Sequence, residues 1–357
     1  METALVLSEK AFGRTGGKTS HGLVRHSLRF RILGVIDSTK AGRDAGEVLD
    51  GKKNGIPIFK SVEQALDNLP KKPDFLIVGV ATVGGMLPKE FRPALREAIK
   101  HKINIISGLH EWLALDPEFS RLAKENSVTI TDIRKESPLK KMHYYRNLAS
   151  KMNAVRIPVL GTDAASGKRT TAVILTKELN DRGIKTSFVA TGQTGLLQGS
   201  RFGVPVDAIR GDYVVGELEN AIDMAYRMEH PRVIIVEGQG ALSHPAYVTG
   251  SRTIVSASSP NAVVLQHAPA RKWRTYHERE LHLPNGTIDR EMELIKAYAG
   301  CDVIAISINH QGMTRTQVLV KIAEYEKEYG IPACDPLVDG TGKIADAIVK
   351  KFFPKKK

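Results

Sequence analysis

Residues 161–171 have the composition of a phosphate-binding loop and read Gly-Thr-Asp-Ala-Ala-Ser-Gly-Lys-Arg-Thr-Thr. Gly161 allows a sharp turn, Gly167 lets an anion approach the backbone closely, and Lys168 supplies a positive charge. A unit charge pair 4 Å apart near a protein surface interacts by roughly 4 kcal/mol, against about 0.3–1 kcal/mol for a helix N-terminus. We therefore expect Lys168 to make the strongest single contact to a phosphate.

The sequence around this loop provides the elements that must position it. An apolar run at residues 155–160 precedes the loop, and Ala172, Leu175 and Leu179 then repeat at helical spacing. The pattern predicts a strand, a glycine loop and a helix whose first amides face the anion. The candidate cofactor-binding residues are Gly161, Thr162, Asp163, Ala164, Ala165, Ser166, Gly167, Lys168, Arg169, Thr170 and Thr171.

The loop departs from the common P-loop pattern in two ways. Five residues separate its two glycines, one more than usual, and Arg169 stands where Ser or Thr usually follows the lysine. The longer spacing with Thr162 and Asp163 resembles the GTDxxxGKT loop of dethiobiotin synthetase, in which the Asp lies near metal and substrate. A plain glycine turn with an exposed Lys168 is the alternative interpretation.

A second acidic position follows a buried-strand pattern at residues 232–236. This run ends at Glu237 in the segment VIIVEGQG, which resembles the VEGAGG segment of dethiobiotin synthetase. A carboxylate at the tip of a neighbouring strand is well placed to hold Mg²⁺ or its water shell. The predicted metal ligands are therefore Thr170, Asp163 and Glu237, for the case in which a nucleoside triphosphate is bound.

His244 lies shortly after that segment and is a candidate general base, because imidazole titrates near neutral pH. A purely structural histidine is the equally good alternative. With Lys168 and Glu237, His244 completes the predicted catalytic residues.

Gln193 and Thr194 are predicted substrate-binding residues. They lie in a glycine-bracketed polar loop directly after a β-rich run at residues 185–190. Because ligands of parallel sheets bind at the carboxyl ends of strands, such a loop is suited to holding the group that reacts. A plain turn is the alternative.

Asp212 and Arg274 complete the predicted substrate-binding set. Asp212 precedes a predicted helix at residues 215–228, so it either caps that helix or binds an amine or metal. Arg274 belongs to a short basic loop with Arg271 and Lys272, which suits an acidic substrate or the base of a nucleotide.

The N-terminal half alternates predicted strands with predicted helices, which indicates a parallel sheet covered on both faces. The strands are expected at residues 31–36, 56–59, 74–80, 104–107 and 128–131, and the helices at 61–69, 91–101 and 118–126. We assign no strand to residues 5–7, and none to the stretch before the glycine-rich segment 13–22. That segment superficially repeats a phosphate loop, and Lys18, Thr19, His21 and Arg25 within and beside it are better suited to reaching a ligand held elsewhere.

The predicted fold class is α/β with two domains, joined by a basic connection at residues 135–151. Residues 1–150 form a Rossmann-like domain, whose pattern resembles the CoA-binding domain of succinyl-CoA synthetases. Residues 151–357 form a P-loop NTPase-like domain that resembles dethiobiotin synthetase.

Composition restricts the classes of function. The 357 residues are 42% hydrophobic and 25% charged, and no apolar stretch reaches the roughly 20 residues that span a bilayer. We expect a cytoplasmic protein without a membrane partner. The net charge of +13 is scattered, which favours small anionic ligands over nucleic acid, and an enzyme of this size is expected to form homo-oligomers.

Five segments together resemble a family of two-domain P-loop proteins that includes the DgcN-type D-glutamate N-acetyltransferases. They are AGRDAGEVLDG, GLVRHS, GTDAASGKRTT, ATGQTG and VEGQGAL. The resemblance implies acetyl transfer from acetyl-CoA to the amine of D-glutamate, a small carboxylate substrate. We expect the phosphates of the cofactor in the cleft at residues 161–171, and the CoA-like N-terminal domain is the alternative place for acetyl-CoA. An ATP- and Mg²⁺-dependent ligase or kinase of the dethiobiotin synthetase type, and a nucleotide-binding regulatory protein, remain the alternatives.

Overall fold

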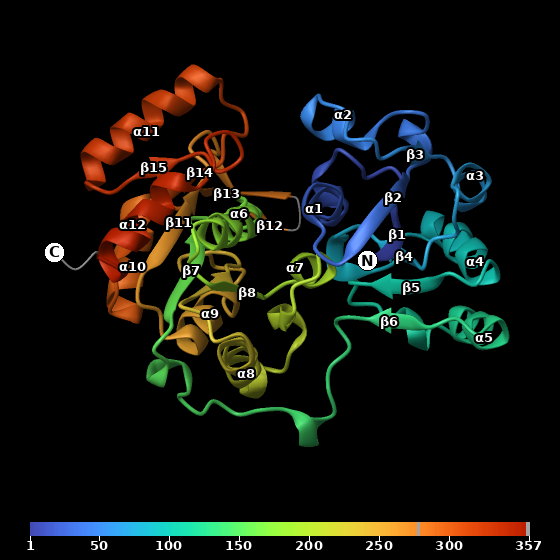
Figure 1. Cartoon of the computed structure of the whole chain (residues 1–357), viewed down its shortest axis with the longest axis horizontal. Helices are drawn as coiled ribbons and strands as arrows, with labels where there is room; N and C mark the ends of the chain where they lie inside the picture. Colours follow the sequence, from blue (N-terminus) through green and yellow to red (C-terminus); the bar gives the residue numbers. More distant parts are fainter. Residues whose placement is uncertain (277–278, 355–357) are drawn as a thin grey trace. The chain divides into compact units, whose positions relative to one another are not determined.

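Two parallel sheets organise the chain, one in each of two units (Figure 1). The computed structural model describes residues 1–276 and 279–354. The first unit contains Met1–Glu136 and Gln193–Ser200, and the second contains Ser137–Gly192 and Arg201–Lys357. The division thus falls after Glu136 instead of residue 150, and a short segment from the C-terminal half belongs to the first unit.

The first sheet has six strands in the order β3-β2-β1-β4-β5-β6, all parallel. This is the doubly wound order in which the winding direction reverses between β1 and β4. The predicted Rossmann-like parallel sheet is confirmed. Its elements are β1 (Glu2–Leu7), α1 (Lys18–His26), β2 (Phe30–Ile36), α2 (Ala45–Asp50), β3 (Ile58–Phe59), α3 (Val62–Asn68), β4 (Phe75–Val78), α4 (Arg92–Lys100), β5 (Asn104–Ser107), α5 (Pro117–Asn126), β6 (Ile130–Asp132) and α7 (Gln193–Leu197).

Strand β1 corrects the sequence prediction, because it is a central strand and it precedes the glycine-rich segment 13–22. It pairs with β2 and β4, and residues 3–7 are buried. A short apolar run cannot be assigned from its own pattern, and β1 is defined by its two neighbours. Helix α1 begins within segment 13–22 and is docked on the end of β4, since the backbone N–H and the hydroxyl of Ser20 both donate to Gly79 O.

Helix α7 packs on α1 inside the first unit. The hydroxyls of Thr194 and Thr19 share a hydrogen bond of 2.9 Å, and Gln198 Nε2 donates to Gly22 O at 2.8 Å. Leu197 joins the apolar cluster that contains Leu23. The segment predicted as a loop at the end of a strand is therefore a short docked helix.

The second sheet has seven parallel strands in the order β15-β14-β11-β7-β10-β8-β9. The predicted P-loop architecture is confirmed, although the basic loop at 271–274 partly belongs to the antiparallel hairpin β12–β13. The elements are β7 (Val155–Gly161), α6 (Lys168–Asp181), β8 (Thr186–Ala190), β9 (Phe202–Gly203), α8 (Gly211–Glu229), β10 (Val233–Glu237), α9 (Gly250–Ser258), β11 (Val263–His267), β12 (Trp273–Tyr276), β13 (Arg279–Pro284), α10 (Ile288–Ala299), β14 (Val303–Ile308), α11 (Arg315–Tyr329), β15 (Ala333–Cys334) and α12 (Gly342–Phe352).

Both faces of the second sheet are buried, because its strands send alternate side chains to opposite faces. Ile157 and Val159 of β7 pack with residues of α6 and α12. Leu160, on the other face, packs with residues of α8, α9 and α10. Strand β7 is therefore held in the middle of the sheet, and the loop that follows it lies at the carboxyl edge.

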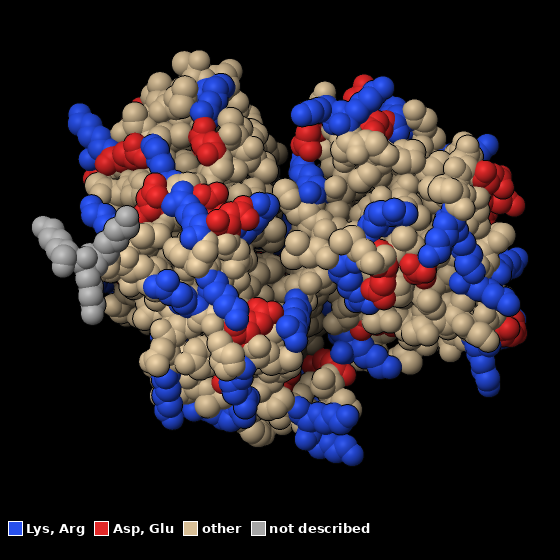
Figure 2. Space-filling model, viewed as in Figure 1, with Lys and Arg blue, Asp and Glu red and all other residues tan. Residues whose placement is uncertain are grey.

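Basic and acidic side chains are intermixed on the face shown in Figure 2. The described residues include ion pairs within one unit, such as Arg92 with Asp116 and Lys296 with Asp302. In the described part of the chain, no helix combines the length and the apolar character that crossing a membrane requires.

Candidate functional site

The loop at residues 161–171 joins β7 to α6 as predicted, and its backbone is shaped for an anion. Gly167 is the N-cap of α6 with a φ of 105°, and no described side chain caps this helix. Ala165 also has a positive φ, 47°, in the left-handed region. The first amides of α6 are therefore available to a ligand, which is the arrangement that binds phosphate in other proteins.

Lys168 is folded into this loop and is only 4% exposed. Its Nζ donates to Asp163 O at 2.6 Å and to Ser166 Oγ at 3.3 Å. Its stem passes two glycines, because a Cβ built on Gly161 or Gly238 would lie 3.0 Å from Lys168 Cδ. Burial lowers the pKa of Lys168 to about 8, because it disfavours the charged ammonium form. A bound anion would stabilise this ammonium group by pairing with its charge.

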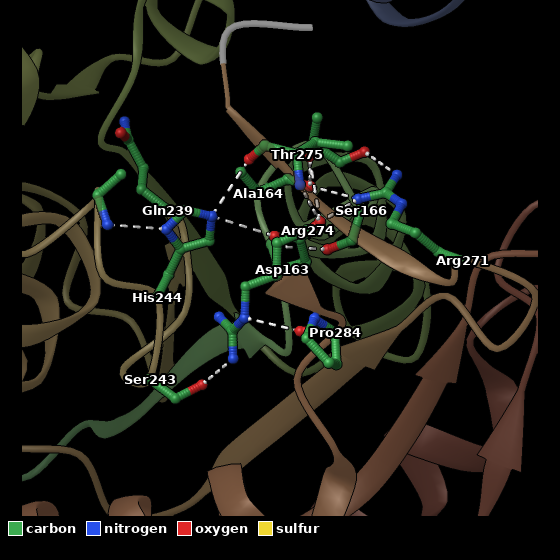
Figure 3. A network of polar contacts seen from close by, with 12 residues as sticks. Asp163, Ala164, Ser166, Gln239, Ser243, His244, Arg271, Arg274, Thr275 and Pro284 are labelled. Carbon is green, nitrogen blue, oxygen red and sulfur yellow. Dashed lines mark hydrogen bonds and ion pairs between the residues drawn. The ribbon is translucent and has the colours of Figure 1, made fainter. Parts of the chain in front are cut away.

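Asp163 is fully buried and lies between His244 on one side and Arg271 and Thr275 on the other (Figure 3). Asp163 Oδ2 accepts from Arg271 Nη1 at 2.8 Å and from the N–H and hydroxyl of Thr275, both at 3.1 Å. Asp163 Oδ1 lies 3.4 Å from His244 Nε2. Burial acts to raise the pKa of Asp163, but the hydrogen bonds from His244 and Arg271 outweigh it and lower the pKa to about 2.

Arg271 holds the loop in shape. Besides Asp163, its guanidinium donates to Ala164 O at 2.6 Å and to Ala165 O at 3.2 Å. These carbonyls belong to the part of the loop with a positive φ, so the side chain stabilises a strained turn. The sequence predicts that the basic loop with Arg271 contacts an acidic substrate or the base of a nucleotide, whereas in the structure Arg271 contacts the phosphate loop itself.

His244 is buried with both ring nitrogens in hydrogen bonds. Nδ1 accepts from Ala246 N at 3.1 Å, and Nε2 lies 3.2 Å from Thr275 O as well as near Asp163. A ring that accepts at Nδ1 and donates at Nε2 is neutral. His244 thus lies against Asp163, and its Nδ1 already accepts from a peptide N–H.

Arg274 belongs to β12 and is connected through Ser243 to the buried carboxylate of Glu291, which was not among the predicted site residues. Its Nη2 donates to Ser243 Oγ at 2.7 Å, and its Nε donates to Pro284 O at 3.2 Å. Ser243 Oγ in turn donates to Glu291, which also accepts from the backbone N–H groups of Leu242 and Ser243 at 3.0 Å each. Glu291 lies in the first turn of α10 and fixes the loop that carries Ser243 and His244.

Glu237 ends β10, next to β7, as predicted. Its Oε2 accepts from Thr191 N at 2.9 Å and from Gly192 N at 3.2 Å. Burial raises the pKa of Glu237 against the opposing influence of Arg169 and these two N–H groups. Arg169, the mismatch with the common P-loop pattern, thus acts electrostatically on the carboxylate at the end of the next strand.

Polar residues at the ends of β11 and β14 also hold the loop, and sequence reasoning did not assign them. Thr162 Oγ1 lies 2.8 Å from His267 Nδ1, and Asn309 Nδ2 donates to Ser166 O at 2.9 Å. Thr171 Oγ1 donates to Gln266 Oε1 at 2.5 Å, so its hydroxyl is committed to the protein. The signal that could have found them is their position directly after apolar strand patterns.

Three of the predicted substrate-binding residues belong to helices α7 and α8. Gln193 and Thr194 belong to the first unit, where Gln193 Nε2 is 3.5 Å from Val80 O. Asp212 is exposed in the first turn of α8, whose N-cap is Arg210, so the expectation that Asp212 caps the helix is wrong.

The predicted metal ligands Thr170, Asp163 and Glu237 contribute oxygens of different kinds. Thr170 is half-buried in the first turn of α6, whereas Asp163 and Glu237 each accept hydrogen bonds from the protein. Among the described residues, no group of three or more His, Cys, Asp or Glu side chains is arranged to hold a metal ion. Any Mg²⁺ here would depend on oxygens brought by a phosphate ligand.

Comparisons with known proteins match both units. Residues 143–345 match a family model described as a domain of unknown function, the DUF1611_C P-loop domain, and residues 38–136 match the DUF1611_N Rossmann-like domain. A crystal structure of a DUF1611 family protein from Anabaena variabilis superposes with a TM-score of 0.88 at 29% identity, covering 98% of this chain and 100% of that one.

Two curated relatives carry the name D-glutamate N-acetyltransferase. The one from Tritonibacter scottomollicae is 32% identical over 279 residues, which is 76% of this chain and 80% of the relative. The one from a Pseudoalteromonas species is 33% identical over 273 residues, covering 75% and 79% respectively. With both domain models matched in order and the phosphate loop in its expected place, the chain belongs to the DUF1611 family, which joins a Rossmann-like N-terminal domain to a P-loop C-terminal domain.

Proposed function

We propose that the chain transfers an acetyl group from acetyl-CoA to the amine of D-glutamate. The observation that carries the proposal is a buried-lysine phosphate loop in a chain that is 32% and 33% identical to two proteins named D-glutamate N-acetyltransferase. The relatives support the transferase class, and the chemistry of the loop supports a donor that bears phosphates.

The loop suits the diphosphate of acetyl-CoA. Gly167 has no side chain to block the first amides of α6, and Lys168 can exchange Asp163 O for a phosphate oxygen. Exchange of a neutral carbonyl for a charged oxygen favours the bound state, because charge-assisted hydrogen bonds are roughly twice as strong as neutral ones.

Arg274 suits a carboxylate of the acceptor. The residue is 8% exposed, and none of the described residues accepts a hydrogen bond from its Nη1. A buried donor without an acceptor is costly, and a substrate carboxylate would supply the acceptor. Ser243 and Pro284 fix the guanidinium through its other nitrogens, so Nη1 is held in place for such a contact.

The reaction also needs an acceptor for the proton of the substrate ammonium and donors for the tetrahedral oxyanion. Backbone N–H groups are the proposed oxyanion donors. His244 and Glu237 are less well suited to take the proton, because His244 Nδ1 and Glu237 Oε2 already accept hydrogen bonds from peptide N–H groups.

The alternative of an ATP-dependent ligase or kinase rests on the loop lysine, which is typical of nucleoside triphosphate sites. In that reaction Lys168 would neutralise the transferred phosphoryl group together with Mg²⁺. A nucleotide-binding regulatory protein would use the same contacts without turnover.

Isothermal titration with acetyl-CoA and with ATP–Mg²⁺ separates these functions. Wild type is compared with Lys168→Ala and with Lys177→Ala, a control on the exposed side of the same helix. We expect acetyl-CoA binding that Lys168→Ala abolishes and Lys177→Ala preserves, and thiol release that depends on D-glutamate and is weaker with L-glutamate. Phosphate release with a carboxylate substrate would favour the ligase, tight nucleotide binding without turnover the regulatory protein, and no binding of either ligand would overturn all three.

A further inference from the structure

His310 and Asp335 form an imidazole–carboxylate pair outside the residues considered so far. His310 Nδ1 is hydrogen-bonded to Asp335 Oδ2, and they follow the carboxyl ends of β14 and β15. The side chain of Asp335 is 1% exposed and that of His310 is 39% exposed. Asp335 Oδ1 accepts from Leu337 N at 3.0 Å, so the carboxylate is fixed on both oxygens.

The pair lies at the same edge of the sheet as the phosphate loop. Gln266 of β11 is paired both with Ser307 of β14 and with Gly161 of β7, so these three residues lie level across the sheet. Parallel strands are about 4.8 Å apart, which places β14 about 10 Å from β7. The residue before His310, Asn309, contacts the phosphate loop directly through Ser166 O.

We propose that His310, positioned by Asp335, is the general base that takes a proton from the ammonium group of the substrate. The inference rests on the proposed acetyl transfer. Because the buried carboxylate of Asp335 accepts the Nδ1–H of His310, the lone pair of the ring is on Nε2, which can accept a proton. His244 differs, because its Nδ1 already accepts from Ala246 N and its Nε2 carries the proton.

The step balances without a further reactant. Nε2 of His310 takes one proton from the substrate ammonium, and the freed nitrogen lone pair forms the C–N bond to the thioester carbon. The C–S bond breaks as the tetrahedral oxyanion collapses, and the sulfur leaves with its electron pair. The proton that the nitrogen sheds on becoming an amide goes to the thiolate, and the proton on His310 returns to solvent.

Two further charged groups lie next to Asp335 in the described structure. Asp339 accepts from Asp335 N at 3.3 Å, and Arg315 of α11 is paired with Asp339. Asp335 is the carboxylate that contacts the imidazole directly.

The test compares three variants in the D-glutamate-dependent thiol-release assay. His310→Gln removes the base at an exposed position, and Asp335→Asn removes its positioning partner. His143→Gln is the matched control, because His143 is 38% exposed and bonded through Nδ1 to Glu217 at 2.7 Å, on the segment before β7 and against α8.

We expect His310→Gln to lower kcat about 10²- to 10⁴-fold with little change in the KM for acetyl-CoA. Added imidazole or higher pH should restore part of this loss, since both supply free amine without His310. Asp335→Asn should lower kcat less and shift the pH profile, and His143→Gln should match wild type. Two outcomes would overturn the role of His310 and leave the proposed function intact. In one, the His310→Gln chain is as active as an active wild type; in the other, neither imidazole nor higher pH restores the lost activity. A wild type without thiol release overturns the proposed function and this role with it.

Discussion

Lys168 Nζ donates to the backbone oxygen of Asp163 at 2.6 Å, so the phosphate loop holds its own ammonium group inward. The side chain of the same aspartate points the other way, to Arg271, Thr275 and His244. One residue thus carries both the acceptor for the loop lysine and the carboxylate that fixes the turn. The backbone geometry at Asp163 therefore links the loop lysine to the network drawn in Figure 3.

The first prediction concerns the stability cost of the buried lysine. Folding lowers the pKa of Lys168 from 10.5 to about 8, mainly through burial, so between these values the unfolded chain binds more protons than the folded one. Its contribution to stability therefore rises with pH across that window, and the charged form costs about 3 kcal/mol at neutral pH. In urea denaturation, Lys168→Met should increase the free energy of unfolding at neutral pH by up to about 3 kcal/mol. It should also remove the increase of stability with pH between pH 8 and 10.5. Lys177→Met is the control, and a Lys168→Met chain less stable than wild type would contradict the argument.

The second prediction concerns Asp163, whose pKa is lowered from 3.8 to about 2. Its stabilising contribution is complete above the unfolded value and is lost as pH falls through the folded one, which corresponds to about 2 kcal/mol. Asp163→Asn should cost about 3–5 kcal/mol at neutral pH, because Arg271 loses its buried partner. Asp163→Asn should also abolish the loss of stability that wild type shows as pH falls between these two pKa values. Urea denaturation followed by circular dichroism measures both effects.

Asp181→Asn provides the comparison for that experiment. Asp181 pairs with Lys177 on the surface of α6, where an ion pair contributes little. Equal losses of stability in the two variants would show that the buried network around Asp163 stabilises the protein no more than a surface ion pair does.

The third prediction concerns Gly238, which leaves room for the lysine stem. A Cβ at this position would lie 1.9 Å from Val159 O and 3.0 Å from Lys168 Cδ. Since Val159 belongs to β7 and cannot move cheaply, Gly238→Ala should cost about 1–3 kcal/mol of stability. Under the proposed function it should also weaken acetyl-CoA binding. Gly211→Ala is the control, because no described atom lies within 4 Å of the added carbon, and it should cost nothing. Thermal unfolding measures the stability of the two variants, and titration with acetyl-CoA measures their binding. Equal stability and equal binding of Gly238→Ala and Gly211→Ala would contradict the prediction.

The fourth prediction concerns the acceptor site and depends on the proposed function. Arg274→Lys keeps the charge but removes the planar fork that contacts Ser243 and Pro284. Hydrogen bonds to charged groups contribute about 1.5–3 kcal/mol, so the KM for D-glutamate should rise about 10- to 100-fold while that for acetyl-CoA stays constant. Arg290→Lys, exposed on α10, should leave both constants unchanged. A parallel rise in both KM values would point to a general disturbance of the loop.

The phosphate loop was predictable because its determinants are local. The apolar run before Gly161, the two glycines and the helical repeat after Lys168 lie within one short stretch, and the structure has β7, the loop and α6 there. The helix predicted at residues 61–69 is likewise present as α3, and Ser61 caps it by accepting from Gln64 N. Such patterns depend on backbone geometry and spacing along the chain.

The contacts that hold the loop were not predictable, since they join residues far apart in the sequence. Arg271 reaches Asp163 only because β11 pairs with β7, and Glu291 reaches Ser243 from the first turn of α10. Strand β1 was missed for a related reason, because its identity comes from β2 and β4 on either side. Gln193 and Thr194 follow a strand of the second unit but pack in the first.

By itself, the sequence determined the class of fold, the two-domain order and the position of the phosphate loop, because hydrophobic periodicity and glycine placement act between near neighbours. Only the tertiary structure decided which polar groups meet at the carboxyl edge of the second sheet. Strand order brings Glu237, Asp163, His267 and His310 to that edge. There burial lowers the pKa of Lys168, and hydrogen bonds lower the pKa of Asp163 against the effect of burial. Neither strand order nor burial depends on neighbouring residues alone, and both arise when the whole sheet packs between its helices.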